Sequence, residues 1–186
     1  MSARLLAGAT RSVRWQAVLL GVLLAAAVPV SAQTAEPTLD RTTVIVVRHA
    51  EKLSDEGDPS LSPAGVARAE ELSRSLADLP VAVLFASRTR RARETLEPLS
   101  SRFGIPIRDY EGRDTDGLAR TIRSDHFGQV VVVAGHSNTV PELVRALGVE
   151  SVADMTEDDY DDLFVVRLHA DGSATALHMH FGAPSG

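Results

Sequence analysis

Two histidines of this chain each follow a run of apolar residues, and each lies beside side chains that can bind an anion. Arg48 and His49 come directly after the apolar run 44–47, and His136 follows a second run at 130–134. An imidazole can act as a nucleophile or proton carrier, and a guanidinium group is a planar donor that matches phosphate oxygens. These residue types in these places predict a site of chemistry that includes anion-binding groups.

The apolar runs themselves are typical of strands that are buried on both faces. A third run at 81–86 precedes a group of arginines, and helical patterns separate the three runs. Strands that alternate with helices predict an α/β fold, with a mostly parallel sheet in a three-layer α/β/α arrangement. In such sheets, ligands bind at the carboxyl ends of the strands, which is where both histidines are expected.

The first helix has a clear start signal, because Ser62 can cap it and Pro63 suits its first position. We expect one apolar stripe of this helix to face the sheet. The stripe consists of Val66, Ala69, Leu72, Leu76 and Leu79.

The C-terminal part predicts a β-hairpin, formed by residues 163–168 and 174–181. Because side chains alternate between the two faces of a strand, one face is expected to carry Phe164, Val166, Leu177, Met179 and Phe181. His178 and His180 then share the other face. A metal pair is the alternative interpretation, but without a clear third ligand two such histidines are typical of plain surface, and no metal is expected. We interpret the acidic segment 154–162 as a solvated surface turn.

The order of these motifs resembles the histidine phosphatase superfamily, the phosphoglycerate-mutase-like enzymes, over nearly all of residues 42–148. Arg48-His49-Ala50-Glu51 stands where that family has an Arg-His-Gly signature. Residues 61–65 match its first helix start, Ser87 with residues 91–95 matches its second arginine motif, and residues 135–137 match its second histidine.

The resemblance implies a metal-independent phosphomonoester hydrolase without a cofactor. His49 would be the nucleophile that becomes a phosphohistidine, while Arg48, Arg91 and His136 hold the phosphoryl group. The substrate would be a small phosphorylated compound or a phosphoprotein. Two alternatives remain at this point: a phosphomutase, and a weak or inactive protein of the same fold that binds a phosphorylated ligand.

The proton donor for the leaving group is less well defined by the sequence. Glu51 and Glu111 are the two candidates, with Asp114 and Asp116 close to the second. Ser137 stands where the acid phosphatases and phytases of the family carry an aspartate. Asn138 could contact the phosphate, but we favour a role as the cap of the fourth helix.

The other arginines near Arg91 are interpreted as surface charges. They are Arg88, Arg90 and Arg93.

Residues 1–32 have the pattern of a secretory signal peptide. Three arginines precede an apolar core, and Val30-Ser31-Ala32 predicts cleavage after Ala32. An uncleaved anchor is the competing interpretation. The expected organisation is therefore a leader, a linker at 33–41 and one catalytic domain at 42–186, exported to the periplasm or secreted.

Composition narrows the class of partner. The chain has no cysteine, which excludes disulfides and thiolate chemistry. Loss of the leader would change the formal net charge from −6 to −9, because the leader holds three of the 19 basic residues and no acidic one. An acidic domain is a poor partner for nucleic acid or an anionic membrane, and the oligomeric state is left open.

Overall fold

The structure, a computed structural model, describes residues 41–185. Residues 1–32 and 33–40, interpreted as leader and linker, lie outside the described residues. Arg41, placed in the linker by the sequence, is the first residue of a strand. None of the helices in the described part is both long and apolar enough to span a membrane.

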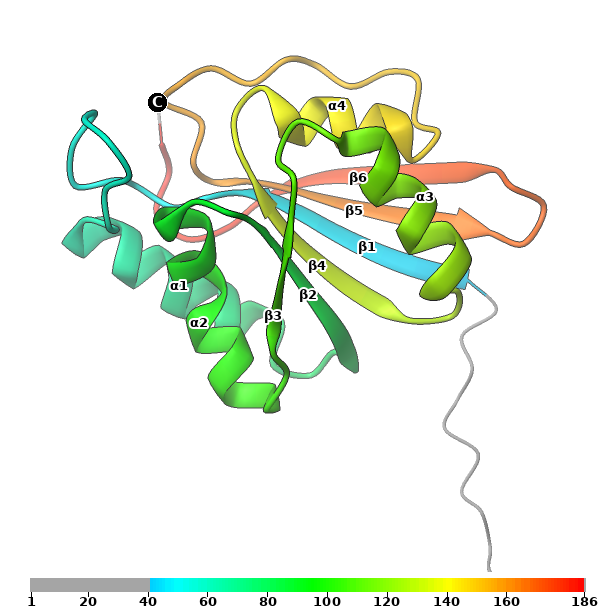
Figure 1. Cartoon of the computed structure of the whole chain (residues 1–186), viewed down its shortest axis with the longest axis horizontal. Helices are drawn as coiled ribbons and strands as arrows, with labels where there is room; N and C mark the ends of the chain where they lie inside the picture. The colour runs from blue at the N-terminus through cyan, green and yellow to red at the C-terminus, as the bar shows by residue number, and fades with distance from the viewer. Residues whose placement is uncertain (1–40, 186) are drawn as a thin grey trace, which may run out of the picture. The chain divides into compact units, whose positions relative to one another are not determined.

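Six strands and four helices alternate along the described residues (Figure 1). The strands are β1 (Arg41–Arg48), β2 (Val81–Ser87), β3 (Ile107–Tyr110), β4 (Val130–Gly135), β5 (Asp162–His169) and β6 (Ala174–His180). The helices are α1 (Pro63–Ser75), α2 (Arg90–Phe103), α3 (Thr115–Asp125) and α4 (Thr139–Ala146).

The strands form one sheet in the order β3-β2-β4-β1-β5-β6. The first four in this order are parallel, while β5 pairs with β1 and β6 in an antiparallel manner. This arrangement confirms the predicted α/β fold with a C-terminal hairpin. β1 and β4 are neighbours, with Arg48 opposite Gly135, so the residues that follow the two strands meet at one edge of the sheet.

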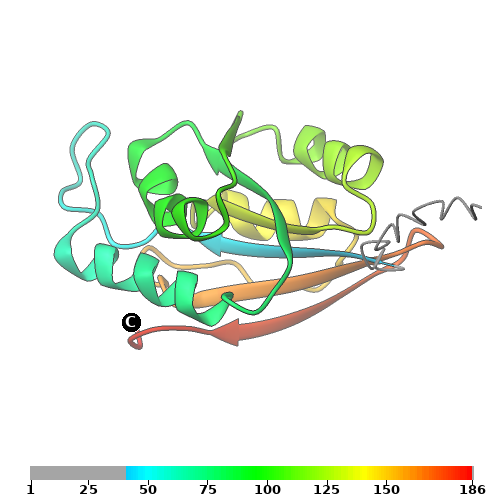
Figure 2. The same ribbon diagram turned by 90° about the horizontal axis from the view of Figure 1, so that it is seen from below.

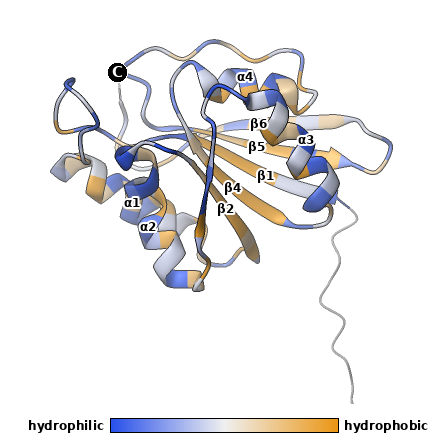
Figure 3. Ribbon diagram, in the orientation of Figure 1, coloured by the Kyte–Doolittle hydropathy of each residue, from blue (hydrophilic) through white to orange (hydrophobic). Residues whose placement is uncertain are grey.

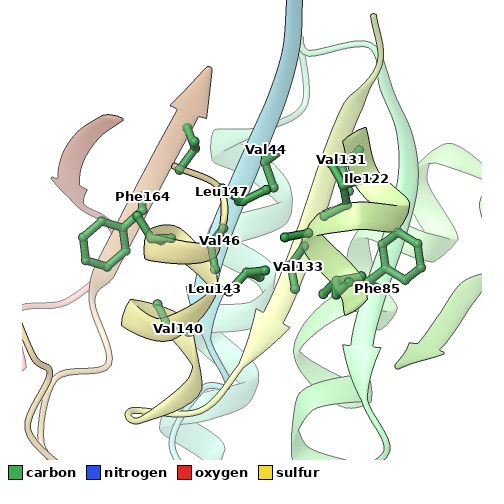
Figure 4. Packing of buried hydrophobic residues seen from close by; sticks show 14 of the residues in the cluster. Val44, Val46, Phe85, Ile122, Val131, Val133, Val140, Leu143, Leu147 and Phe164 are labelled. Carbon is green, nitrogen blue, oxygen red and sulfur yellow. The ribbon is translucent and has the colours of Figure 1, made fainter. Parts of the chain in front are cut away.

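The sheet separates two apolar clusters, with helices on both of its sides (Figure 2). On one side, Val44 and Val46 of β1 pack with Leu143 and Leu147 at α4 (Figure 4). On the other side, α1 and α2 contribute residues such as Leu72 to a second cluster. The central strands are apolar along their length (Figure 3), which explains the unbroken valine runs: each strand is covered on both faces.

α1 begins as predicted, because the Ser62 hydroxyl accepts a hydrogen bond from the Gly65 amide at 3.1 Å. Gly65 has no room for a side chain, since an added Cβ would lie 2.2 Å from the Glu51 carbonyl oxygen. The predicted stripe holds only in its middle. Leu79 is 38% exposed, because the helix ends at Ser75 and Leu79 lies beyond it; Val66, within the first turn of the helix, is 52% exposed.

The hairpin forms as predicted, but the assignment of its faces was wrong. Phe164 lies directly opposite His178 in the β5–β6 register, and residues that oppose each other project from the same face. The two rings stack with centroids 4.5 Å apart. Leu177 and Met179 are therefore on the other face, where they are exposed. Alternation fixes which residues share a face within each strand, and only the register relates the two strands.

Candidate active site

A pocket of about 400 Å³ opens at the carboxyl edge of the parallel strands. It contains the two predicted histidines, whose ring centroids are 5.2 Å apart. His49 follows β1 and His136 follows β4, and the His49 amide donates to the Gly135 carbonyl oxygen at 2.9 Å. The lining residues are His49, Lys52, Ser87, Arg88, Thr89, Arg91, Glu111, Gly112, Arg113, His136, Ser137, Asn138, Thr139 and Glu157.

The hydrogen bonds of His49 fix its tautomer. Its Nδ1 lies 2.8 Å from the Ala50 carbonyl oxygen, which can only accept, so Nδ1 carries the proton. Its Nε2 accepts a hydrogen bond from Arg91 Nε at 3.0 Å. The lone pair of Nε2 therefore lies on the side of the ring that faces the guanidinium group, which is the position a nucleophile for a bound phosphoryl group needs.

Arg91, in the first turn of α2, contacts both histidines. Besides its contact with His49, its terminal nitrogen lies 3.5 Å from His136 Nδ1. Because a guanidinium group only donates, Nδ1 of His136 is the acceptor, and its Nε2 donates to the Ser87 hydroxyl at 2.8 Å. Ser87 ends β2, so three neighbouring strands contribute to the site.

The surroundings keep both imidazoles neutral. Burial lowers the pKa of His49 from 6.5 to about 3, and the nearby His136, Arg91 and Arg48 act in the same direction. Burial also lowers the pKa of His136 to about 4, again with help from the two arginines. Positive charge that disfavours imidazole protonation is the same charge that attracts a phosphate dianion. His49 is thus unprotonated and lies in surroundings whose positive charge favours an anion.

Arg48 is close to the histidines, but it does not line the open pocket. Its side chain is 1% exposed, and its guanidinium group donates to the carbonyl oxygens of Thr156 at 3.0 Å and Asp159 at 3.4 Å. The Tyr160 ring lies 4.0 Å from the guanidinium carbon. Its Nε is a buried donor without a partner among the described residues. One donor of Arg48 is thus left without an acceptor of its own.

Glu157 is the residue of this site that sequence reasoning missed. Its carboxylate accepts from Arg48 at 3.0 Å and from the Ser137 hydroxyl at 2.6 Å. The Ser137 hydrogen bond and the charge of Arg48 lower the pKa of Glu157, despite an opposing effect of burial. Residues 157 and 158 form an exposed turn, as predicted, but the Glu157 carboxylate contacts Arg48, and Asp162 at the end of the segment is buried at the start of β5. An isolated acidic run carries no signal for a contact with an arginine more than 100 residues away.

The two candidate acids lie in different places. Both carboxylate oxygens of Glu51 accept from Arg68, Oε1 from the terminal nitrogen at 2.7 Å and Oε2 from Nε at 3.1 Å, and Glu51 is not among the pocket residues. Glu111 lines the pocket and forms an ion pair with Arg88 at 3.2 Å. Asp114 instead caps α3 by accepting from the Gly117 amide at 2.9 Å. Geometry thus favours Glu111 over Glu51 as the proton donor.

Asn138 does not cap α4 with its side chain, although it occupies the N-cap position. Its backbone is already helical there, and the Asn138 side chain lines the pocket instead. Thr139 accepts from the His136 amide at 3.1 Å and so satisfies the backbone at this end.

Of the remaining arginines, Arg90 and Arg93 make exposed contacts with Asp58 and Asp109. Arg88 is exposed as well, but it lies at the pocket rim.

Comparison with known structures shows the same fold in phosphatases. A structure of the protein histidine phosphatase SixA complexed with tungstate is 19% identical, with a TM-score of 0.63, and the match covers 74% of this chain and 96% of that one. A putative phosphohistidine phosphatase SixA from Nakamurella multipartitia is 23% identical, with a TM-score of 0.57 and coverages of 77% and 98%. A mycobacterial glucosyl-3-phosphoglycerate phosphatase is 14% identical, with a TM-score of 0.59 and coverages of 77% and 100%.

No curated protein sequence matches the chain. Residues 44–115 match the family described as the histidine phosphatase superfamily (branch 1). This segment contains Arg48, His49 and Arg91, and the topology described above supplies His136 next to them. The sequence match to this family thus covers 72 of the 186 residues, and the fold of the whole domain is similar to that of these phosphatases.

Proposed function

We propose that the protein is a phosphomonoester hydrolase that acts through a phosphohistidine on His49. The observation that carries this proposal is the hydrogen-bonding pattern of His49. Nδ1 donates to a backbone carbonyl, while the lone pair of Nε2 faces Arg91. A phosphoryl group bound by Arg91 would lie against that lone pair.

In the first step, His49 Nε2 attacks phosphorus and the bond to the leaving oxygen breaks. Charge on the equatorial oxygens is stabilised by Arg91, by the positive field of Arg48 and by His136. A dianion beside His136 favours protonation of its Nδ1, which changes this atom from an acceptor into a donor toward the phosphoryl group. The bound substrate thus raises the pKa of His136.

The leaving alkoxide takes a proton from a carboxylic acid, and the presence of Glu111 in the pocket supports this residue for the role. Glu157 is less suitable, because its lowered pKa favours the ionised form, which has no proton to give. In the second step, water attacks the phosphohistidine and loses a proton to the same carboxylate. Inorganic phosphate leaves, and His49 returns to its neutral state.

The direct test is to mix the protein with a phosphate monoester and trap the phosphoenzyme. We expect an acid-labile, base-stable phosphoryl group in the wild type and none in His49→Ala, with turnover lost as well. His126→Gln is the matched control, since this buried histidine bonds to Gln129 and is absent from the pocket. Turnover that survives in His49→Ala would overturn the proposal.

Product analysis separates the related activities. Release of inorganic phosphate without an isomerised ester supports hydrolysis, whereas an isomerised ester would indicate a mutase. Binding of phosphate esters by the wild type without turnover would indicate a binding protein. A comparison of Glu111→Gln with Glu51→Gln assigns the acid, because only the first should lower turnover, by roughly 10²–10⁴-fold.

We also propose that the enzyme acts outside the cytoplasm, as a small exported member of the family. The support is the sequence of residues 1–32, with its arginines, apolar core and small residues before Gln33. Amino-terminal sequencing of the protein purified from cells should give a chain that starts at Gln33. A chain that retains residues 1–32 would contradict this part.

A further inference from the structure

The β5–β6 hairpin carries a second pair of histidines, and the structure adds a carboxylate to it. Asp162 lies opposite His180 in the strand register, and His178 lies two residues before His180 on the same face of β6. Asp162 Oδ1 is 2.6 Å from His178 Nε2 and 3.3 Å from His180 Nδ1. The third ligand that could not be identified in the sequence is thus present across the strand pair.

The spacing of these three atoms suits one metal ion. All three lie within 4.8 Å of one another. Ligands of a tetrahedral zinc ion, at 2.0–2.1 Å from the metal, are separated by about 3.3 Å. Small rotations of two exposed imidazoles would bring the atoms to that spacing, because the side chains of His178 and His180 are 47% and 65% exposed.

The surroundings hold the cluster in place and give it negative charge. His178 stacks on Phe164, which belongs to the apolar core. The Asp162 side chain is only 10% exposed, so its position is fixed by the strand. Asp161 lies within 3.6 Å of His180 Nδ1 and accepts a hydrogen bond from Ser185. A buried carboxylate with a second one beside it favours a cation.

We propose that Asp162, His178 and His180 form a binding site for a divalent transition-metal ion, with Zn²⁺ as the best fit. Two imidazoles and a carboxylate suit Zn²⁺, Cu²⁺ or Ni²⁺, while Mg²⁺ and Ca²⁺ require mainly oxygen ligands. The Asp161 carboxylate or a water completes the coordination. The inference does not depend on the proposed phosphatase activity, because none of these residues lines the active-site pocket.

The position of the site indicates its role. Asp162 begins β5 directly after the segment 156–160, whose carbonyl groups, Glu157 and Tyr160 contact Arg48. An ion bound between the start of β5 and the end of β6 ties this segment to the edge strand. It therefore stabilises the folded state, since it binds the assembled hairpin and not the unfolded chain.

The test is calorimetric titration of ZnCl₂ into the chain after treatment with a chelator and dialysis. We expect one ion per chain in the wild type, and affinity at least roughly tenfold weaker in His178→Ala and in His180→Ala. His169→Gln is the matched control, because His169 lies on the same hairpin but contacts Thr175 instead of the cluster. This variant should bind zinc like the wild type.

A second measurement, of the melting temperature, distinguishes loss of the zinc site from misfolding of a variant and from zinc binding at other histidines. At a free zinc concentration about 100 times the Kd, the wild-type melting temperature should rise by about 5 °C or more. Without zinc, His180→Ala should melt close to the wild type, since its side chain is 65% exposed, whereas His178→Ala loses its contacts with Phe164 and Asp162 and should melt lower. Zinc should not raise the melting temperature of either variant. Absence of zinc binding in the wild type would overturn the proposal. Equal binding by a His178→Ala, His180→Ala double variant would overturn it as well.

Discussion

Two neighbouring strands bring His49 and His136 together, whereas His178 and His180 lie on one strand, and the surroundings of the two pairs give them opposite tendencies. His49 and His136 follow central parallel strands, where burial and arginines keep them neutral and favour an anion. His178 and His180 lie on the exposed edge strand, beside Asp161 and Asp162, where a cation is favoured. In the two proposals the same side chain is assigned to phosphoryl transfer in one place and to metal binding in the other, according to burial and the sign of the neighbouring charges.

The largest expected effect comes from removing positive charge beside His49 and His136, which we call the central pair. Arg91→Ala should lower kcat/KM for a phosphate monoester by roughly 10²–10³-fold, because it removes donors aimed at the developing charge. Arg93→Ala, on the same helix but paired with Asp109 at the surface, should change kcat/KM by less than about twofold. Steady-state kinetics of the two variants measures both changes in kcat/KM. Equal effects would mean that Arg91 acts only through general surface charge.

The next effect is on stability as a function of pH. In the unfolded chain the two imidazoles titrate near 6.5, whereas in the folded chain the pKa is about 3 for His49 and about 4 for His136. Below pH 6.5 the unfolded state therefore binds more protons, and stability falls as the pH is lowered. From pH 7 to pH 5 each buried histidine should remove about 1–2 kcal/mol from the free energy of unfolding.

Urea denaturation at the two pH values measures this difference. A His49→Gln, His136→Gln variant should lose most of it, while His169→Gln should keep it, since His169 is at the surface. If the double variant kept the full pH dependence, the central pair would not be neutral in the folded state.

A smaller effect is expected from the carboxylate that contacts Arg48. Glu157 is largely exposed and competes with an incoming phosphate for positive charge. Glu157→Gln keeps the shape and removes the charge, so KM should fall by about two- to fivefold. Asp158→Asn, in the same segment but without a side-chain contact to Arg48 among the described residues, is the control. An increase in KM for Glu157→Gln would show that Glu157 helps to bind the substrate.

The smallest effect is expected from chelation. The central pair uses guanidinium groups as its source of positive charge, so EDTA should change the initial rate of hydrolysis by less than about twofold. The same treatment should remove an ion from the hairpin and lower the melting temperature. Loss of hydrolysis in EDTA that zinc restores would show that the two regions depend on each other.

The sequence predicted the central pair because its signals are local. An apolar run that ends at Arg48-His49, and another that ends at His136, each identify a buried strand and its exit within a few residues. Parallel strands in one sheet then bring the two exits to the same edge. The fold class and the proximity of His49, His136 and Arg91 could therefore be predicted.

The remaining features depend on register and on distant contacts. The faces of the hairpin follow from the pairing of Phe164 with His178, and the third atom of the cluster comes from Asp162 across the strand pair. The contact of Glu157 with Arg48 joins segments more than 100 residues apart. Periodicity within one segment carries no information about any of these contacts.

The anchoring of Arg48 has a consequence for biosynthesis. Its guanidinium group is fixed by carbonyl oxygens that lie 108 and 111 residues further along the chain. A nascent chain can form β1 and expose His49 early, but the cation beside it is oriented only after β5 has paired with β1. Contacts of such high sequence separation form slowly, so the orientation of Arg48 is expected to be a late step of folding.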